Sequence, residues 1–200
     1  IMPSLVGSEM CIRDRHFMEQ KDLSCSSERL EIRPIAYSDY ESWLEGFLNR
    51  SPSKHPYDQG LIDMSECTQE WFEALVDKHQ ALMKEDDMYI FAIFDQLGNH
   101  LGMLDIVTIQ RANFNWGEIG YFVHNQFWRQ GYAFEAISKI LPLVNERLEF
   151  HRIEAHVNID NDPSINLLKK VGFEYECTRK AFIYENGAWT DNKIFYINLD

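Results

Sequence analysis

The pattern of apolar and polar side chains predicts most of the secondary structure. Residues 30–35 alternate with a period of two, which is typical of a strand with one buried face. Trp71 and Leu75 share a helical stripe within residues 65–85, so we predict a helix there. A shorter helix is predicted to begin at Ser38, whose side chain can cap its first turn.

Further elements follow from the same periodicities. We predict strands at residues 88–95, 100–110, 116–123, 152–157, 173–184 and 193–199, and helices at residues 131–149 and 163–171. Pro142 lies inside the first of these helices and should kink it or remove one of its backbone hydrogen bonds. The element order is then β-α-α-β-β-β-α-β-α-β-β. This order predicts an α/β or α+β domain in which helices interrupt a mixed sheet.

The first 28 residues carry no sustained period, and the chain begins with Ile1 rather than Met. They also lack the run of about 7–15 apolar residues that a secretory signal needs. We therefore expect residues 1–28 to be a leader or extension outside the fold, whether native or not. A chain of 200 residues accommodates one ordinary domain, so we predict a single domain over residues 29–200.

Composition narrows the classes of function. Hydrophobic residues make up 45% and charged residues 26% of the chain, which is typical of a globular protein. The formal net charge of −13 repels phosphate backbones, so a nucleic-acid binder is not expected and cationic partners such as amines or basic peptides are favoured. No apolar run approaches the roughly 20 residues that a membrane span needs.

The cysteine and histidine spacings argue against a metal site. The four cysteines, at positions 11, 25, 67 and 177, contain no Cys-x-x-Cys pair, which excludes a zinc knuckle or a thioredoxin-type motif. His124, His151 and His156 are each interpreted as structural, because no spacing of His, Cys and Asp suggests a metal. We expect reduced thiols, no metal and a cytoplasmic protein.

The stretch from Gly120 to Ala136 is the most informative about chemistry. A predicted strand leads into a short loop there, and Gly131 opens a helix. Gly131 and Ala133 are small enough for a ligand to approach the backbone, and the first N–H groups of a helix have no intrahelical partner. The stretch therefore predicts a site for phosphate or pyrophosphate, although a plain strand-to-helix connection gives the same pattern.

Several ordered motifs resemble the GNAT acetyltransferase superfamily over about residues 30–199. The segment Trp128-Arg129-Gln130-Gly131-Tyr132-Ala133 is similar to the acyl-CoA pyrophosphate loop of that superfamily. Asn161-x-x-Ser164, together with Val171-Gly172-Phe173, is similar to its second CoA-side motif. Within the superfamily, the chain resembles the RimJ/RimL branch of protein N-terminal acetyltransferases in particular. The segments that carry this resemblance are Gly120-Tyr121, Trp128, Phe134-Glu135-Ala136, His151-Arg152-Ile153 and Gly187-x-Trp189-x-Asp191. This resemblance implies a mixed, mostly antiparallel sheet of about seven strands flanked by about four helices.

The resemblance also implies acetyl-CoA as the co-substrate. Its pyrophosphate would rest on backbone N–H groups of residues 129–133, and its pantetheine arm would pair with the strand at Phe122 and Val123. A backbone N–H of that strand would then donate to the thioester carbonyl as an oxyanion hole. The implied cofactor-binding residues are Phe122, Val123, Arg129, Gln130, Gly131, Tyr132, Ala133, Asn161 and Ser164.

Three polar residues have both a structural and a chemical interpretation. Asn161 and Ser164 either cap a helix or serve the ligand, Asn161 by bonding the pantetheine and Ser164 by protonating or solvating the departing thiolate. Glu118 is either a solvated strand residue or the carboxylate that takes a proton from the incoming amine. Leu168 stands where many members of the superfamily have a tyrosine acid, so that acid is absent.

These inferences predict an acetyl-CoA-dependent N-acetyltransferase, in which the N-terminal amine of a protein attacks the thioester directly in a ternary complex. The resemblance favours an alanine terminus on a basic protein such as a ribosomal protein. Two alternatives stay open: an acetyltransferase for a small amine such as a polyamine or aminoglycoside, and a GNAT-like module that binds acyl-CoA without turnover. We expect a monomer or homodimer that binds neither nucleic acid nor membrane.

Overall fold

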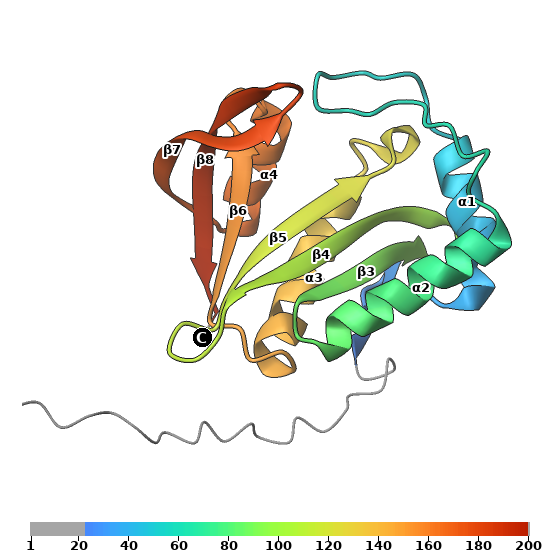
Figure 1. Ribbon diagram of the computed structural model, residues 1–200, viewed down its shortest axis with the longest axis horizontal. Helices are drawn as coiled ribbons and strands as arrows, with labels where there is room; N and C mark the ends of the chain where they lie inside the picture. Colours follow the sequence, from blue (N-terminus) through green and yellow to red (C-terminus); the bar gives the residue numbers. More distant parts are fainter. Residues whose placement is uncertain (1–22, 200) are drawn as a thin grey trace, which may run out of the picture.

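A twisted sheet organises the computed structural model, which describes residues 23–199 (Figure 1). In that part of the chain eight strands form the sheet, in the order β1-β2-β3-β4-β5-β6-β8-β7. The strands are β1 (Cys25–Ser26), β2 (Leu30–Arg33), β3 (Met88–Asp95), β4 (His100–Gln110), β5 (Trp116–Val123), β6 (Arg152–Asn158), β7 (Glu174–Glu185) and β8 (Ala188–Asn198). The α-helices are α1 (Tyr40–Leu48), α2 (Gln69–Lys84), α3 (Tyr132–Glu146) and α4 (Asp162–Val171).

All neighbouring strands of this sheet run antiparallel except β5 and β6. A parallel pair needs a crossover connection, and here the crossover consists of a loop and α3. The crossover explains why the first N–H groups of α3 lie at the end of β5. The mixed, mostly antiparallel sheet with four flanking α-helices matches the predicted class, and β1 adds an eighth strand to the expected seven.

Helices cover the two faces of the sheet unequally. Helices α3 and α4 lie on one face, where Phe91, Leu104 and Ile119 belong to the larger apolar core. Helices α1 and α2 lie on the other face, and Ala92 and Phe94 of β3 pack in the smaller core beneath them. Within residues 23–199 no helix covers β6, β8 or β7 on this second face, and α1 reaches β5 near its end, where Phe47 packs against Phe122 (Figure 1). We call this uncovered surface of β5, β6, β8 and β7 the open face.

Two predicted boundaries are wrong for local physical reasons. Helix α1 begins at Tyr40, because Ser38 lies exposed in a 3₁₀ turn and makes no cap; the buried carboxylate of Asp39 instead accepts hydrogen bonds from Arg33 (2.7 Å) and the Ala36 N–H (2.8 Å). Strand β8 begins at Ala188 rather than at residue 193. A two-residue turn joins it to β7, so the pairing of the two strands continues to their ends.

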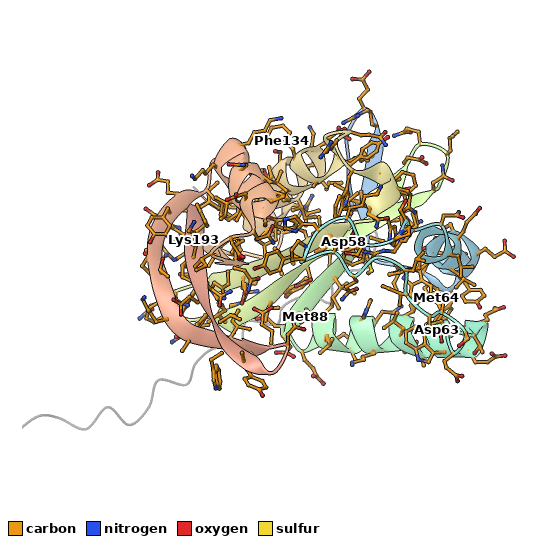
Figure 2. The ribbon with its side chains drawn as sticks, turned by 90° about the horizontal axis from the view of Figure 1, so that it is seen from above. Asp58, Asp63, Met64, Met88, Phe134 and Lys193 are labelled. Carbon is orange, nitrogen blue, oxygen red and sulfur yellow. The ribbon has the colours of Figure 1, made fainter. Side chains whose placement is uncertain are left out.

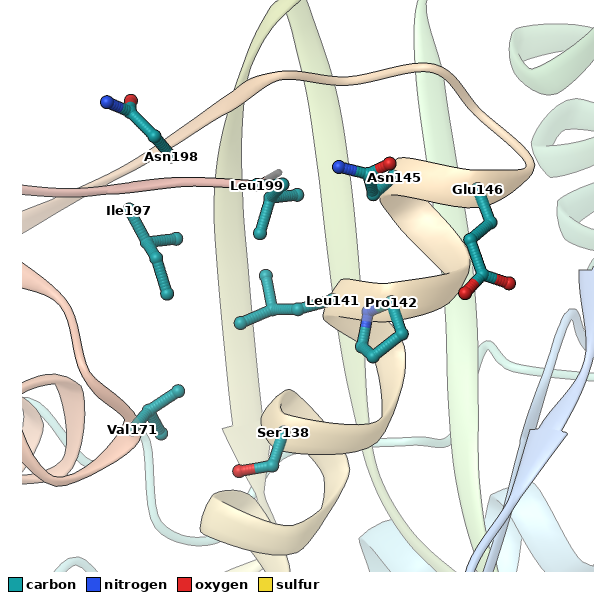
Figure 3. A pocket seen from close by; sticks show the side chains of 9 residues that line it. All are labelled: Ser138, Leu141, Pro142, Asn145, Glu146, Val171, Ile197, Asn198 and Leu199. Carbon is teal, nitrogen blue, oxygen red and sulfur yellow. The ribbon is translucent and has the colours of Figure 1, made fainter.

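Pro142 does not end or break α3, which continues through it to Glu146. Because proline has no N–H, the carbonyl of Ser138 loses its helical donor. Ser138 and Pro142 line a surface hollow of about 350 Å³ together with residues from the ends of α4 and β8 (Figure 3). The expected loss of one helical hydrogen bond thus falls in the part of α3 that borders this hollow.

The fold begins earlier than the expected boundary at Arg29. Leu23 is only 4% exposed and belongs to the larger core, and Cys25 and Ser26 pair with Ile32 and Glu31 of β2. The Ser27 hydroxyl donates to Glu135 of α3 at 2.5 Å. Residues 23–28 are therefore part of the folded unit, whereas the rest of the expected leader, residues 1–22, lies outside the described residues.

We predict that β1 contributes measurably to stability. A chain starting at Glu28 should have a free energy of unfolding about 2–4 kcal/mol lower than one starting at Leu23, because it loses one buried leucine, a strand pair and the Ser27 hydrogen bond. Urea denaturation of the two chains measures this difference. Equal midpoints and slopes would show that β1 is dispensable and would restore a boundary near Arg29.

Candidate functional site

The parallel pair of β5 and β6 opens into a V part-way along its length. Among residues 23–199, the pairing comprises Trp116 with Arg152, Gly117 with Ile153 and Glu118 with Glu154, and stops there. Beyond Glu118, β5 still pairs with β4 up to Val123, and β6 still pairs with β8. The two strands diverge above this point in Figure 1. The edge of β5 from Ile119 to Val123 therefore offers its backbone groups to the opening.

The loop at the end of β5 has the geometry of an anion site. Arg129 (φ 64°) and Gly131 (φ 82°) both adopt left-handed conformations just before α3 begins at Tyr132. Turns of this kind gather successive backbone N–H groups into a concavity that suits anions, and the helix dipole favours negative charge there. A Cβ placed on Gly131 would meet, among the described residues, only the Arg29 guanidinium, at 3.6 Å. Open space thus lies in front of the loop.

Arg29, directly before β2, holds the loop and the first turn of α3 together. Its guanidinium donates to the Gln130 carbonyl (3.1 Å) and to the Glu135 carboxylate (2.8 Å), and it lies 4.8 Å from the centre of the Tyr132 ring. The contacts join residues about 100 positions apart in the sequence, so no local pattern could indicate them. Arg29 also places a positive charge beside the predicted anion loop.

A pair of hydroxyl groups lies on the helix-covered side of the V. The Tyr121 hydroxyl, on β5, lies 2.6 Å from the Ser164 hydroxyl in the first turn of α4. Burial raises the pKa of Tyr121 to about 12, against the opposing effect of the hydrogen bond with Ser164, so the phenol keeps its proton. Asn161 caps α4 by accepting the Ser164 N–H at 3.4 Å, which confirms the structural interpretation of Asn161.

Leu168 is fully buried in the core, so it places no acid at the V. Tyr121 was not singled out from the sequence as a chemical residue. Its pairing with Ser164 depends on how α4 packs against β5, and no motif spacing expresses that packing. Hydroxyl groups are thus present at Tyr121 and Ser164, whereas position 168 carries none.

A network of charged groups lies on the open face, next to the V. Glu118 accepts from His156 Nδ1 at 3.0 Å, and the other ring nitrogen of His156 lies 3.2 Å from Glu154. Burial opposes a charge on His156, but the hydrogen bonds with the two carboxylates outweigh it, so its pKa is raised. Arg152 and Arg179 also pair with the buried Glu154. Glu118 keeps a side chain that is 33% exposed.

A loop that we call the strap, residues 51–60, passes over the V. Asp58, which belongs to the strap, is buried and accepts from Arg50 (2.9 Å) and Asn125 (2.9 Å). Burial opposes the charge of Asp58, but these and backbone hydrogen bonds outweigh it and lower its pKa to about 2. At the far side of the V, the Tyr57 hydroxyl donates to Asp160. Viewed from above, Asp58 lies over the middle of the sheet (Figure 2).

Two buried histidines, His100 and His124, pack where β5 leads into the loop before α3. His124 directly follows β5, and its Nε2 lies 3.0 Å from Nδ1 of His100 on β4. Burial lowers the pKa of His100 to about 4, and burial together with His100 and Arg50 lowers that of His124 to about 3. Both rings are therefore neutral at neutral pH, which fits the structural interpretation of His124.

The structure brings the sequence-predicted site residues to the two arms of the V. Arg129, Gln130, Gly131, Tyr132 and Ala133 form the loop and the start of α3. The side chain of Phe122 is partly exposed, whereas Val123 packs against the larger core, so each contributes backbone to the V. Among residues 23–199 no cluster of His, Cys, Asp or Glu could hold a metal, and Cys25, Cys67 and Cys177 form no disulfide.

Comparison with known proteins connects this geometry to a family. Residues 29–174 match the acetyltransferase (GNAT) domain family, which is most of the chain. The chain belongs to the GNAT acetyltransferase family. The uncharacterized N-acetyltransferase YoaA of Bacillus subtilis (strain 168) is 39% identical over 175 residues, covering 86% of this chain and 94% of YoaA.

Two further similarities lie in the RimJ/RimL neighbourhood of the GNAT family. The ribosomal protein uS5-alanine N-acetyltransferase of Escherichia coli (strain K12) is 25% identical over 168 residues, covering 84% of this chain and 86% of that enzyme. The structure of Mycobacterium smegmatis RimJ in complex with CoA-disulfide superimposes with a TM-score of 0.68 at 24% identity, covering 84% and 81% of the two chains. The expected class, a GNAT N-acetyltransferase, is confirmed.

As a GNAT acetyltransferase, the protein transfers an acyl group from a donor to an acceptor. No helix within residues 23–199 is long and apolar enough to cross a membrane. In this structure the Tyr121–Ser164 pair lies on the helix-covered side, the loop before α3 leads into that side, and Glu118 and Glu154 lie on the open face.

The buried histidine pair predicts acid sensitivity. Because the pKa values of His100 and His124 are lower in the folded protein than the usual 6.5, the unfolded chain binds more protons below pH 6.5. The free energy of unfolding should therefore fall on acidification from pH 6.5 towards 4, by up to about 1.4 kcal/mol per pH unit for each histidine.

Urea denaturation between pH 5.0 and 6.5 measures this slope before most carboxylates titrate. His124→Gln should make the slope shallower, whereas His151→Gln, at an exposed position, should leave it as in the unaltered protein. An unchanged slope in His124→Gln would contradict the assignment of the acid sensitivity to the pair.

Proposed function

We propose that this GNAT protein transfers an acetyl group from acetyl-CoA to the N-terminal amine of a basic protein, with an alanine terminus of a ribosomal protein as the favoured acceptor. One observation carries the proposal. The V between β5 and β6 has a loop suited to anions and a hydroxyl pair on one side and the partly exposed carboxylate of Glu118 on the other. This arrangement suits a direct transfer from a phosphorylated donor to an ammonium-bearing acceptor.

The residues around the loop fit acetyl-CoA. The backbone N–H groups of Arg129, Gln130, Gly131, Tyr132 and Ala133 lie at the start of α3, where the helix dipole and the charge of Arg29 both favour the pyrophosphate. The free edge of β5 at Phe122 and Val123 can pair with the amides of the pantetheine as an added strand. A backbone N–H of this edge would donate to the thioester carbonyl.

The leaving thiolate would receive its proton from the hydroxyl pair. Ser164 lies in the first turn of α4, and Tyr121 lies 2.6 Å behind it, so a proton given by Ser164 can be replaced from the phenol. Asn161 uses its carbonyl oxygen as the cap and keeps its amide N–H groups for the pantetheine. No metal and no covalent enzyme intermediate is needed for this route.

The acceptor amine would arrive from the open face, where Glu118 is the exposed member of the charged network. An ammonium next to Glu118 forms a charge-assisted hydrogen bond and is placed at the mouth of the V. The net charge of −13 attracts basic proteins and raises their rate of encounter. The name of the Escherichia coli relative, a uS5-alanine N-acetyltransferase, supports a protein terminus as the acceptor.

Acetyl-CoA binding can be tested at the loop. Gly131→Glu would place a side chain and a negative charge in front of the N–H groups, so we expect the affinity for acetyl-CoA to fall by more than about tenfold in isothermal titration calorimetry. Gly98→Glu is a matched control, since Gly98 also has a positive φ (84°) and lies in the open turn between β3 and β4. Unchanged binding in a folded Gly131→Glu protein would remove the loop assignment.

Acceptor choice can be tested by thiol release from acetyl-CoA. A basic peptide that starts with alanine should have a higher kcat/KM than spermidine, an aminoglycoside or a matched peptide with neutral side chains. Its advantage over the neutral peptide should shrink as salt is added, because the Debye length is already only about 8 Å at physiological ionic strength. Faster acetylation of spermidine would favour a small-amine enzyme, and acetyl-CoA binding without thiol release from any amine would indicate a non-catalytic module.

A further inference from the structure

A second carboxylate lies beside Glu118 on the open face. Asp105 of β4 is directly opposite Gly120 of β5, two positions along the strand from the pair formed by Val107 and Glu118. A Cβ placed on Gly120 would come within 2.8 Å of Asp105 Oδ1 and 3.0 Å of Oδ2, so the carboxyl group lies against the glycine backbone. Only a residue without a side chain at position 120 leaves room for it.

The Asp105 carboxyl has no partner within residues 23–199. It is half-buried, yet it forms no hydrogen bond or ion pair with any residue among 23–199. A carboxylate in this state is costly, because burial weakens its hydration and nothing replaces it. Burial, reinforced by the charge of Glu118, raises the pKa of Asp105 from 3.8 to about 6.

The surrounding charges do not neutralise Asp105. On β6, His156 and Glu154 bond to each other, and His156 also bonds to Glu118. On β7, Arg179 is paired with Glu154. On α2, which packs on β3, the buried His79 has a pKa lowered to about 4 by burial and by Lys78, so it is neutral. The cation that would complete the site is therefore one that comes from outside the fold.

We propose that Asp105 is the proton acceptor for the incoming amine, and that Glu118 beside it holds the ammonium in place. This inference rests on the proposed acetyl transfer and specifies its substrate as a primary ammonium. The two carboxylates lie on adjacent strands at the point where β5 and β6 separate, so an ammonium between them lies at the mouth of the V. An alcohol acceptor would bring no charge to offset the pair.

The step balances as follows. Asp105 takes one proton from the ammonium, and the freed lone pair forms the C–N bond to the acetyl carbonyl carbon. The C–S bond breaks with its electron pair on sulfur, and the Ser164–Tyr121 hydroxyls protonate the thiolate. The nitrogen loses its second proton to water, and a proton from water restores the hydroxyl pair. Asp105 then releases its proton to water. The products are the acetamide, the thiol of CoA and one proton.

Asp105 suits this role better than Glu118 for two reasons. Glu118 already accepts a hydrogen bond from His156, whereas both oxygens of Asp105 are free to receive the ammonium. The pKa of about 6 at Asp105 is also nearer to that of an N-terminal amine, roughly 7.7–8.0, than an ordinary carboxyl pKa is. Proton transfer to Asp105 is therefore about a hundredfold more favourable than transfer to an ordinary aspartate.

The pH dependence of Asp105→Asn tests the proposal. At pH 7, kcat/KM for an alanine-starting peptide should fall by about a hundredfold or more, as expected for loss of a general base. At pH 9 the amine is already neutral, so the loss should shrink to within about threefold. Asp87→Asn makes the same chemical change at an exposed position and should leave both values unchanged. Retained acetyl-CoA binding shows that each variant is folded.

Gly120→Ala provides a second, independent variant. It keeps both carboxylates but places a methyl group where the Asp105 carboxyl lies, so it should reproduce the pH-dependent loss. A loss of equal size at pH 7 and pH 9 in Asp105→Asn, or no loss, would overturn the role of Asp105 while leaving acetyl transfer intact. Absence of thiol release from the unaltered protein with every amine would overturn the proposed function itself.

Discussion

The short parallel contact between β5 and β6 is the constraint on which the rest of the structure depends. Three residue pairs join the strands, and the parallel direction requires a crossover that α3 provides. The crossover in turn brings the first N–H groups of α3 to the end of β5. Had the pairing continued, β6 would occupy the backbone edge of β5 that we propose for the donor. Had it been absent, Glu118 and His156 would not be neighbours.

The V separates two kinds of chemistry by the two faces of one strand. Because side chains alternate along β5, Tyr121 points to the helix-covered side, and Glu118 and Gly120 belong to the open face. Proton-donating hydroxyls and proton-accepting carboxylates thus lie on opposite sides of a single backbone. The buried Glu154 is stable in this setting because His156, Arg152 and Arg179 satisfy it.

The sequence could predict whatever is encoded locally. The loop of residues 128–133 and the hairpin turns depend on neighbouring residues, and most strands show an alternation of apolar and polar side chains. The sequence therefore predicts these elements. Asp105, Tyr121 and Arg29 were missed because their importance arises from contacts across strands and helices. Strand β1 was missed for another reason: two residues are too few to show an alternation, and its burial depends on α3 and β2.

The last two strands lie in the sheet in the reverse of their chain order, with β8 between β6 and β7, and this order has a consequence for folding kinetics. Strands β1 to β5 are neighbours in the sheet in chain order, so each can pair with the strand just before it. Strand β6 has only three pairs with β5 and otherwise depends on β8, which pairs with β7 across a tight turn. The hairpin of β7 and β8 therefore has to form and dock before β6 is held. Since closing longer loops slows folding, the V should be among the last regions to form.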